Sequence, residues 1–110
     1  MTKIKRGDVW WVKFPHSVGG EIKKTRPAVI ISNNPSNEIM NRVQIIPLTS
    51  NISRVFSSEA LIKFSKIKSK ALAHQIQTVS KIRLINKEAK LSKKQIERID
   101  NAIKVQLGLL

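Results

Sequence analysis

The sequence predicts a mainly β fold, a small barrel or curled sheet followed by one C-terminal helix. Several short runs rich in β-branched and aromatic residues follow one another, and polar loops separate them. One segment near the C-terminus instead has apolar residues at helical spacing. Strands in series with one helix at the end differ from the alternating strands and helices of a parallel sheet. Because 110 residues fit one hydrophobic core, residues 1–110 are expected to form a single domain.

The first expected strand runs from Asp8 to Phe14, which is rich in aromatic and β-branched residues. Trp10 and Trp11 are neighbours in it, so they should point to opposite faces, with at least one of them in the core. The following stretch, from Pro15 to Thr25, has the composition of a surface loop.

A continuous apolar run within Arg26 to Ser32 predicts a buried central strand. Because Arg26 precedes Pro27, its backbone is biased toward extended geometry, and its side chain leaves the strand end in a restricted direction. A polar loop over residues 33–41 should lead to a third strand over 42–48, which stops at Thr49 and Ser50.

The rest of the chain predicts weaker strands and one well-defined helix. After a loop over 51–57, strands are expected over 59–64 and 71–79, separated by the basic segment 65–70. The terminal helix is indicated by a capping box, an apolar stripe and a closing glycine, formed by Ser92 with Gln95, by Ile96, Ile99, Ile103 and Leu107, and by Gly108.

The charge balance indicates a polyanionic partner. The chain has 21 Lys and Arg against 7 Asp and Glu, a formal net charge of +14. Membrane surfaces are also polyanionic, but no apolar run approaches the roughly 18 residues that span a bilayer. The polar face of the terminal helix carries both signs of charge, so nucleic acid is favoured and no membrane association is expected.

The absence of cysteine excludes disulfides, thiolate metal sites and cysteine nucleophiles. It also suits a reducing cytoplasm. The N-terminus has no apolar segment of the signal-peptide kind, so the protein is expected to be cytoplasmic.

The distribution of acidic residues argues against a metal-dependent nuclease. Glu97 and Asp100 are close in sequence, but both are expected on the solvated face of the helix. Without clustered carboxylates, paired histidines or a glycine-rich phosphate loop, no metal and no cofactor are expected. RNA cleavage needs neither, because the ribose 2′-hydroxyl is the nucleophile and the protein supplies proton transfer, charge stabilisation and positioning.

Four motifs follow one another in the chain: Gly7-Asp8-Val9-Trp10; Glu21 with Arg26-Pro27-Ala28-Val29-Ile30; Pro47-Leu48-Thr49-Ser50; and Gln75-Ile76-Gln77-Thr78-Val79-Ser80-Lys81 with Arg83-Leu84. In this order and spacing they resemble the MazF and PemK family of toxins, from Gly7 to about Leu109. The resemblance implies an SH3-like β-barrel, of the type that CcdB-like toxins share, and a homodimer. It also implies a toxin of a type II toxin-antitoxin system that cuts single-stranded mRNA without a metal, leaving a 2′,3′-cyclic phosphate and a 5′-hydroxyl.

The resemblance also implies roles for individual residues. It places Arg26 and Thr49 at the scissile phosphate, Glu21 at the position of a loop carboxylate and Gln75 at an RNA contact. Many relatives carry Asp before that Gln, where this chain has His74. His74 is expected either to alter base preference alone or to add a phosphate contact or proton-transfer group. Further RNA-binding candidates are His16, Lys23, Lys24 and Ser50.

Two questions stay open at the level of sequence. Arg26 is expected to assist proton transfer as well as to brace the phosphate, but arginine has a very high reference pKa, so the sequence leaves the general base open, with Glu21 and a bound water as the alternatives. The same fold also occurs in gyrase-targeting toxins, and an RNA-binding module without turnover is a further alternative, although Arg26 with Thr49 favours the nuclease. The expected inhibitor is a cognate antitoxin whose acidic, disordered segment folds on binding.

Overall fold

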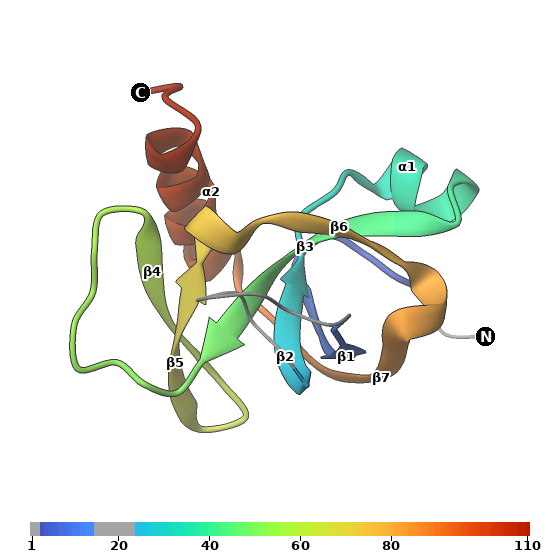
Figure 1. The fold of residues 1–110 in the computed structure, drawn as a ribbon, viewed down its shortest axis with the longest axis horizontal. Coiled ribbons are helices and arrows are strands. Elements are labelled where there is room, and N and C mark those ends of the chain that lie inside the picture. Colours follow the sequence, from blue (N-terminus) through green and yellow to red (C-terminus); the bar gives the residue numbers. More distant parts are fainter. Residues whose placement is uncertain (1–2, 15–23) are drawn as a thin grey trace.

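The computed structural model describes residues 3–14 and 24–110. Its strands form one strongly curled antiparallel sheet in the order β4-β5-β3-β2-β1-β7, with β6 also paired to β3 (Figure 1). The strands are β1 (Asp8–Lys13), β2 (Thr25–Ile30), β3 (Arg42–Thr49), β4 (Glu59–Phe64), β5 (Ile67–Leu72), β6 (Gln77–Ser80) and β7 (Leu84–Lys90). The helices are α1 (Asn34–Ile39) and α2 (Lys93–Gln106), with short 3-10 turns η1 (Ala73–Gln75) and η2 (Lys81–Arg83). The predicted mainly β fold with a C-terminal helix is confirmed.

The curled sheet has an apolar cluster on each face. The first packs beneath α2 and consists of Val9, Val29, Ile46, Leu48, Ala60, Ile62, Phe64, Ala71, Ala73, Leu91, Ile99 and Ala102. The second lies on the other face and consists of Trp10, Val12, Phe14, Ala28, Ile30, Val43, Ile45 and Val79. Because successive side chains on a strand alternate between faces, β1, β2 and β3 contribute to both clusters.

The first three predicted strands are confirmed as β1, β2 and β3. Trp10 is buried in the second cluster. Trp11 is partly exposed, and its Nε1 donates to Glu88 Oε1 at 2.9 Å. The alternation predicted for the two tryptophans therefore holds.

The prediction of an irregular loop over residues 33–41 is wrong, because α1 lies within it. The Asn33 side chain caps this helix by accepting from the Ser36 amide at 2.9 Å. Pro35 stands in the first turn, where its missing N–H leaves no hydrogen bond unmade. An Asn-x-Pro start is thus a helix signal, although the segment is too short and polar to show helical periodicity.

The prediction of one strand over 71–79, separated from β4 by the segment 65–70, is also wrong. A tight turn at Ser65 and Lys66 leads directly into β5, which starts at Ile67. Both turn residues have positive φ, 47° and 64°, as a two-residue hairpin turn of the I′ type requires. Such turns usually show Asn-Gly or Asp-Gly, so Ser-Lys gave no signal. The expected strand is further divided by η1.

The last strand, β7, was not predicted. Most of its residues are exposed, and it pairs with β1 through two irregularities in register. It therefore lacks the alternation of apolar and polar residues that marks a half-buried strand. The turn after β4 contacts it, since Ser65 Oγ donates to Glu88 Oε2 at 3.0 Å.

Helix α2 matches its predicted caps. Ser92 accepts from the Gln95 amide at 3.3 Å, and Gly108 follows the helix with φ 71°. The stripe is apolar and packed at its first three positions, whereas Leu107 is exposed. Asp100 was expected to be solvated but forms an ion pair with Arg6.

Arg6 joins three elements around the start of the chain. Its Nε donates to the Ile31 carbonyl at 2.9 Å, beyond the end of β2, and its amide donates to Asn34 Oδ1 at 2.8 Å in α1. With its ion pair to Asp100 on α2, this residue ties the helices to the sheet. In the part of the chain that the structure describes, no helix has the length and apolar character needed to cross a membrane.

Gly7 provides a test of this packing. Its φ is +90°, and a Cβ added there would lie 2.4 Å from Ile96 Cδ1 of α2. We expect Gly7→Ala to lower the free energy of unfolding by about 2 to 4 kcal/mol, because backbone strain and a clash add together. Gly108→Ala is the matched control: its φ is also positive, at +71°, but nothing lies within 4 Å of the added Cβ. Urea denaturation of both variants measures the difference, and equal losses would contradict a clash at Gly7.

Candidate active site

The candidate site forms where β3 ends, between β2 and β5. Ala28 with Pro47 is the last pair of the ladder between β2 and β3, and Arg26 and Thr49 each lie two residues beyond it, on the same face as those two residues. On the other edge of β3, Thr49 pairs directly with Lys70 of β5. Residues directly opposite each other project from the same face of a sheet. Arg26, Thr49 and Lys70, here called the Thr49 row, therefore share a face.

Arg26 is exposed at the start of β2. It pairs in register with Val12 of β1, which holds its backbone on that side. Pro27 follows it and favours this extended backbone, as the sequence predicted. Its guanidinium forms no hydrogen bond or ion pair with any other described residue, which leaves its donors available to a ligand.

Thr49 is half-buried at the end of β3. Its Oγ1 accepts from the Asn51 amide at 3.3 Å. A hydroxyl has one donor and two acceptor sites, so this contact leaves the Thr49 proton free to be donated. Asn51 in turn accepts from Ser53 Oγ at 2.9 Å, which gives the chain a defined course after the strand.

Lys70 belongs to a cluster of charged groups around a buried carboxylate. Glu59, at the start of β4, is only 8% exposed. Its Oε1 accepts from Lys70 Nζ at 3.1 Å and from the Phe56 amide at 2.9 Å. Its Oε2 lies 3.0 Å from Nε2 of His74 in η1. Lys70 Nζ also donates to the Arg54 carbonyl at 2.6 Å.

Burial and hydrogen bonding shift the pKa of Glu59 in opposite directions, and hydrogen bonding has the larger total effect. Burial alone raises the pKa of Glu59, but hydrogen bonds from the Phe56 amide, His74 and Lys70 together hold that pKa below its ordinary value of 4.5. The carboxylate is therefore ionised at neutral pH and attracts the Lys70 ammonium.

The other predicted residues fall into two groups. Lys24, Ser50 and His74 are exposed, and Gln75 is half-buried, around the β2 start, the β3 end and η1. Lys24 has φ 69°, and its carbonyl accepts from the Phe14 amide at 3.0 Å, which places it beside β1. The structure thus brings Arg26, Thr49, Ser50 and Lys24 to one end of the sheet. His74 is connected to this end by Glu59, which contacts both His74 and Lys70. His16, Glu21 and Lys23 lie outside the described residues.

Sequence reasoning missed Lys70 and Glu59. Lys70 was assigned to a separating segment, although Ser69 and Ala71 on either side of it are buried and alternate with charged neighbours. That alternation was a usable strand signal. Glu59 had no such signal, because its partners come from three separate segments.

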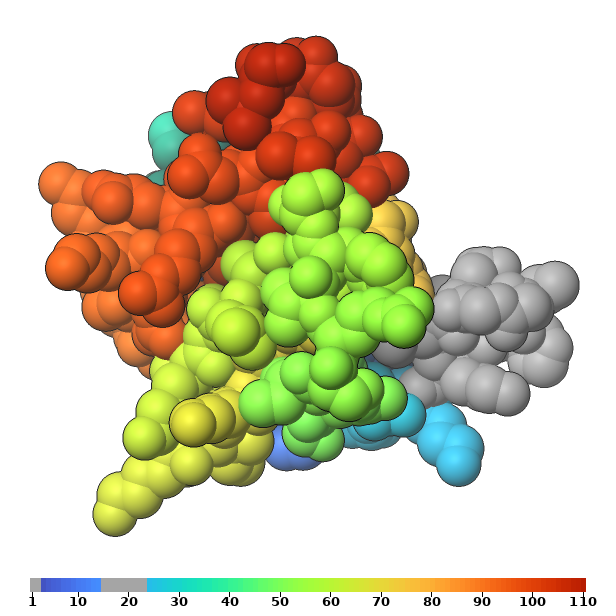
Figure 2. Space-filling view, turned by 90° about the vertical axis from the view of Figure 1, so that its left-hand side faces the viewer, coloured from blue at the N-terminus to red at the C-terminus, as the bar shows by residue number. Residues whose placement is uncertain are grey.

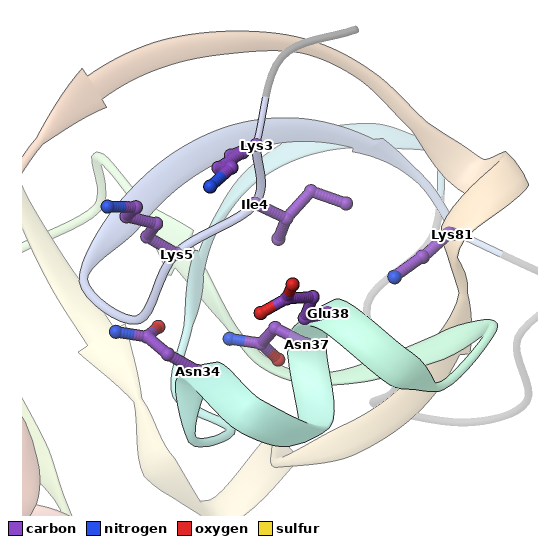
Figure 3. A pocket seen from close by; sticks show the side chains of 7 residues that line it. All are labelled: Lys3, Ile4, Lys5, Asn34, Asn37, Glu38 and Lys81. Atoms are coloured by element: carbon purple, nitrogen blue, oxygen red, sulfur yellow. The ribbon is translucent and has the colours of Figure 1, made fainter.

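Two cavities lie away from the Thr49 row. One of about 300 Å³ is lined by Lys3, Ile4, Lys5, Asn34, Asn37, Glu38 and Lys81, and Figure 3 shows lysines around it with Glu38 near its centre. Another of about 550 Å³ lies between β4 and α2 and is lined in part by Glu59. The described residues contain no group of three or more His, Cys, Asp or Glu side chains that could hold a metal ion.

The depressed pKa of Glu59 predicts a component of acid sensitivity. An unfolded Glu59 binds its proton near pH 4.5, and the folded one only at lower pH. Its ionised contacts therefore stabilise the fold above 4.5, and that contribution is lost as the pH falls through the lower folded-state pKa. We expect Glu59→Gln to be less stable than wild type at neutral pH, with a shallower loss of stability below pH 4.5. Urea denaturation across this range measures it, and parallel pH curves for the two proteins would contradict it.

Comparisons with known proteins identify relatives over nearly the whole chain. A family model described as the PemK-like, MazF-like toxin of type II toxin-antitoxin systems matches residues 5–107. The chain is 30% identical to the endoribonuclease MazF9 of Mycobacterium tuberculosis, over 96% of this chain and 98% of the relative. It is 34% identical to the endoribonuclease MazF of Staphylococcus saprophyticus, over 96% of this chain and 92% of the relative.

Solved structures share the fold at lower sequence identity. The crystal structure of MazF from Deinococcus radiodurans has a TM-score of 0.83 at 20% identity, over 94% of this chain and 96% of that one. A mycobacterial endoribonuclease in complex with its cognate antitoxin has a TM-score of 0.81 at 22% identity, over 96% of each chain. The family match, the two curated relatives and the fold agree, and the chain belongs to the PemK-like, MazF-like family of toxins of type II toxin-antitoxin systems.

Proposed function

We propose that this chain is an endoribonuclease toxin that cuts single-stranded mRNA and so stops translation. The observation that carries the proposal is the Thr49 row: Arg26 and Thr49, distant in sequence, lie on one face of the sheet, each two residues beyond the last pair of the ladder between β2 and β3. Family membership supports the same activity, since both curated relatives are named endoribonucleases. These names also favour turnover over RNA binding alone and over a gyrase target.

In the proposed reaction the scissile phosphate lies against the Thr49 row. The ribose 2′-oxygen attacks phosphorus, and the bond to the 5′-oxygen breaks, leaving a 2′,3′-cyclic phosphate and a 5′-hydroxyl. The Arg26 guanidinium stabilises the charge that develops on the phosphoryl oxygens, and the Thr49 hydroxyl donates a hydrogen bond to one of them. Glu21, outside the described residues, is the third proposed catalytic group and takes the 2′-hydroxyl proton directly or through a water. The proposal assigns no metal or cofactor to the reaction.

RNA binding is proposed to follow the positive charge around this site. Lys24, Ser50, His74 and Gln75 contact the RNA, as do His16 and Lys23 in the undescribed segment. Such side chains bind phosphate and sugar without regard to sequence, and base edges of an unpaired strand supply the specificity.

The proposed physiological partners are a second copy of the chain and a cognate antitoxin. A solved mycobacterial relative binds its cognate antitoxin, which supports the same kind of partner here. The formal charge of +14 suits an antitoxin with an acidic segment that folds as it binds. We propose that the toxin acts in the cytoplasm, where mRNA is translated.

Arg26→Ala tests the assignment of the phosphate-binding arginine. We expect the cleavage rate of a fluorogenic single-stranded RNA to fall about 100-fold or more, because one preorganised donor is removed. Thermal unfolding should change little, since Arg26 is exposed and makes no described contact. Arg42→Ala is the matched control: this exposed arginine stands at the opposite end of the neighbouring strand β3. A folded Arg26→Ala protein as fast as Arg42→Ala would end the assignment.

A single deoxy substitution tests the nucleophile. Replacing the 2′-hydroxyl before the scissile phosphate by hydrogen should abolish cleavage there while RNA affinity stays nearly unchanged, because most affinity comes from phosphate contacts. Cleavage should continue in excess EDTA, and mass spectrometry should find the 2′,3′-cyclic phosphate on the upstream fragment. A metal-activated water would instead leave a linear end and would cut the deoxy site. Retained cutting at that site would refute the mechanism.

A further inference from the structure

Lys70 occupies a position that the proposed mechanism has not used. It pairs with Thr49 across the ladder of β3 and β5, on the edge of β3 opposite to Arg26. Directly opposed residues in an antiparallel pair have Cβ atoms about 4.5 to 5.5 Å apart. A phosphate bound by Thr49 would therefore lie within reach of the Lys70 side chain.

The Lys70 ammonium is held in one place. Its side chain is only 11% exposed, unusually low for lysine. Nζ donates to Glu59 Oε1 at 3.1 Å and to the Arg54 carbonyl at 2.6 Å. An ammonium has three donors, so these two contacts leave one N–H for a ligand.

Glu59 is itself fixed on every side. Its Oε1 also accepts from the Phe56 amide at 2.9 Å, and its Oε2 contacts His74 Nε2 at 3.0 Å. Because His74 contacts Oε2 of Glu59, the contact of Lys70 is with Oε1. Arg54 and Phe56 belong to the segment that follows Thr49, which Figure 2 shows in green on the surface beneath the red helix. The Glu59 cluster, defined as Glu59 with Lys70, His74, Phe56 and Arg54, thus fixes the ammonium of the residue that pairs with Thr49 and part of the chain that follows Thr49.

We propose that Lys70 is a further catalytic residue, donating to a phosphoryl oxygen of the RNA bound at Thr49, and that Glu59 is the residue that positions it. The inference rests on the proposed function. A fixed donor stabilises the charge that develops in the transition state without having to reorganise. Because Glu59 neutralises Lys70, the pair adds little to the long-range attraction for RNA. Its effect therefore falls on kcat more than on KM.

Steady-state cleavage of a single-stranded RNA by Lys70→Met, Lys70→Arg and Glu59→Gln tests the proposal. We expect Lys70→Met to lower kcat about 10- to 100-fold with KM changed less than about 3-fold, and Lys70→Arg to recover much of the rate. Lys68→Met is the matched control, because Lys68 lies two residues from Lys70 on the same strand and face, beyond the residues of β5 that pair with β3. It should leave kcat unchanged. Equal kcat values for Lys70→Met and Lys68→Met would overturn the proposal.

The double variant Glu59→Gln/Lys70→Met separates catalysis from folding. Removing one partner of a buried ion pair destabilises a protein, whereas replacing both partners is often nearly neutral. If the pair served only the fold, the double variant would regain both stability and kcat, which would overturn the proposal. If Lys70 is catalytic and Glu59 acts through it, the double variant folds, judged by circular dichroism and thermal unfolding, and is no slower than Lys70→Met.

The wild-type protein separates this inference from the proposed function. If the wild-type protein does not cut RNA, both the proposed function and this inference are wrong. If the wild-type protein cuts RNA and the Lys70→Met variant is equally fast, only this inference is wrong, and the roles proposed for Arg26 and Thr49 are unaffected.

Discussion

The arrangement of the candidate site depends on β3, an interior strand of the sheet. It pairs with β2 on one edge and with β6 and then β5 on the other. Val43, Ile45, Ile46 and Leu48 are all 0% exposed and divide between the two apolar clusters. A slip of one residue would exchange the faces of the whole strand, so this burial fixes the register. The core thereby determines which residues lie opposite Thr49, although Thr49 is not itself part of the core.

The edge of β3 that carries β5 and β6 is interrupted. Between Ala71, opposite Leu48, and Gln77, opposite Ile45, the chain leaves the ladder and forms η1. His74 and Gln75 project from this interruption, as the functional residues of sheets often do where pairing stops. The contact of His74 with Glu59 connects the interruption to the start of β4. His74, which stands beside Gln75 where many relatives carry Asp, therefore contacts a carboxylate on another strand, β4.

The structure also explains how a strongly basic surface arises from the composition. Of the 7 acidic residues, Asp8, Glu59 and Asp100 form ion pairs with Lys87, Lys70 and Arg6, and Glu88 accepts from Trp11 and Ser65. Asp8 and Glu59 are buried. These acids form contacts within the fold, so among the residues that the structure describes most Lys and Arg side chains have no acidic partner and remain available to a polyanion.

The sequence by itself determined the elements whose signals lie within a few residues. The content of β-branched and aromatic residues marked β1, an apolar run marked β2, and Ser92 and Gly108 marked the limits of α2. The motifs around Arg26 and Thr49 also pointed to the correct family. Only the tertiary structure decided that Lys70 lies opposite Thr49 and that Glu59 joins Lys70 to His74. The physical reason is that these contacts depend on strand register and on a hairpin turn at Ser65 and Lys66. Register is set by the packing of both sheet faces at once, which no local window of sequence contains.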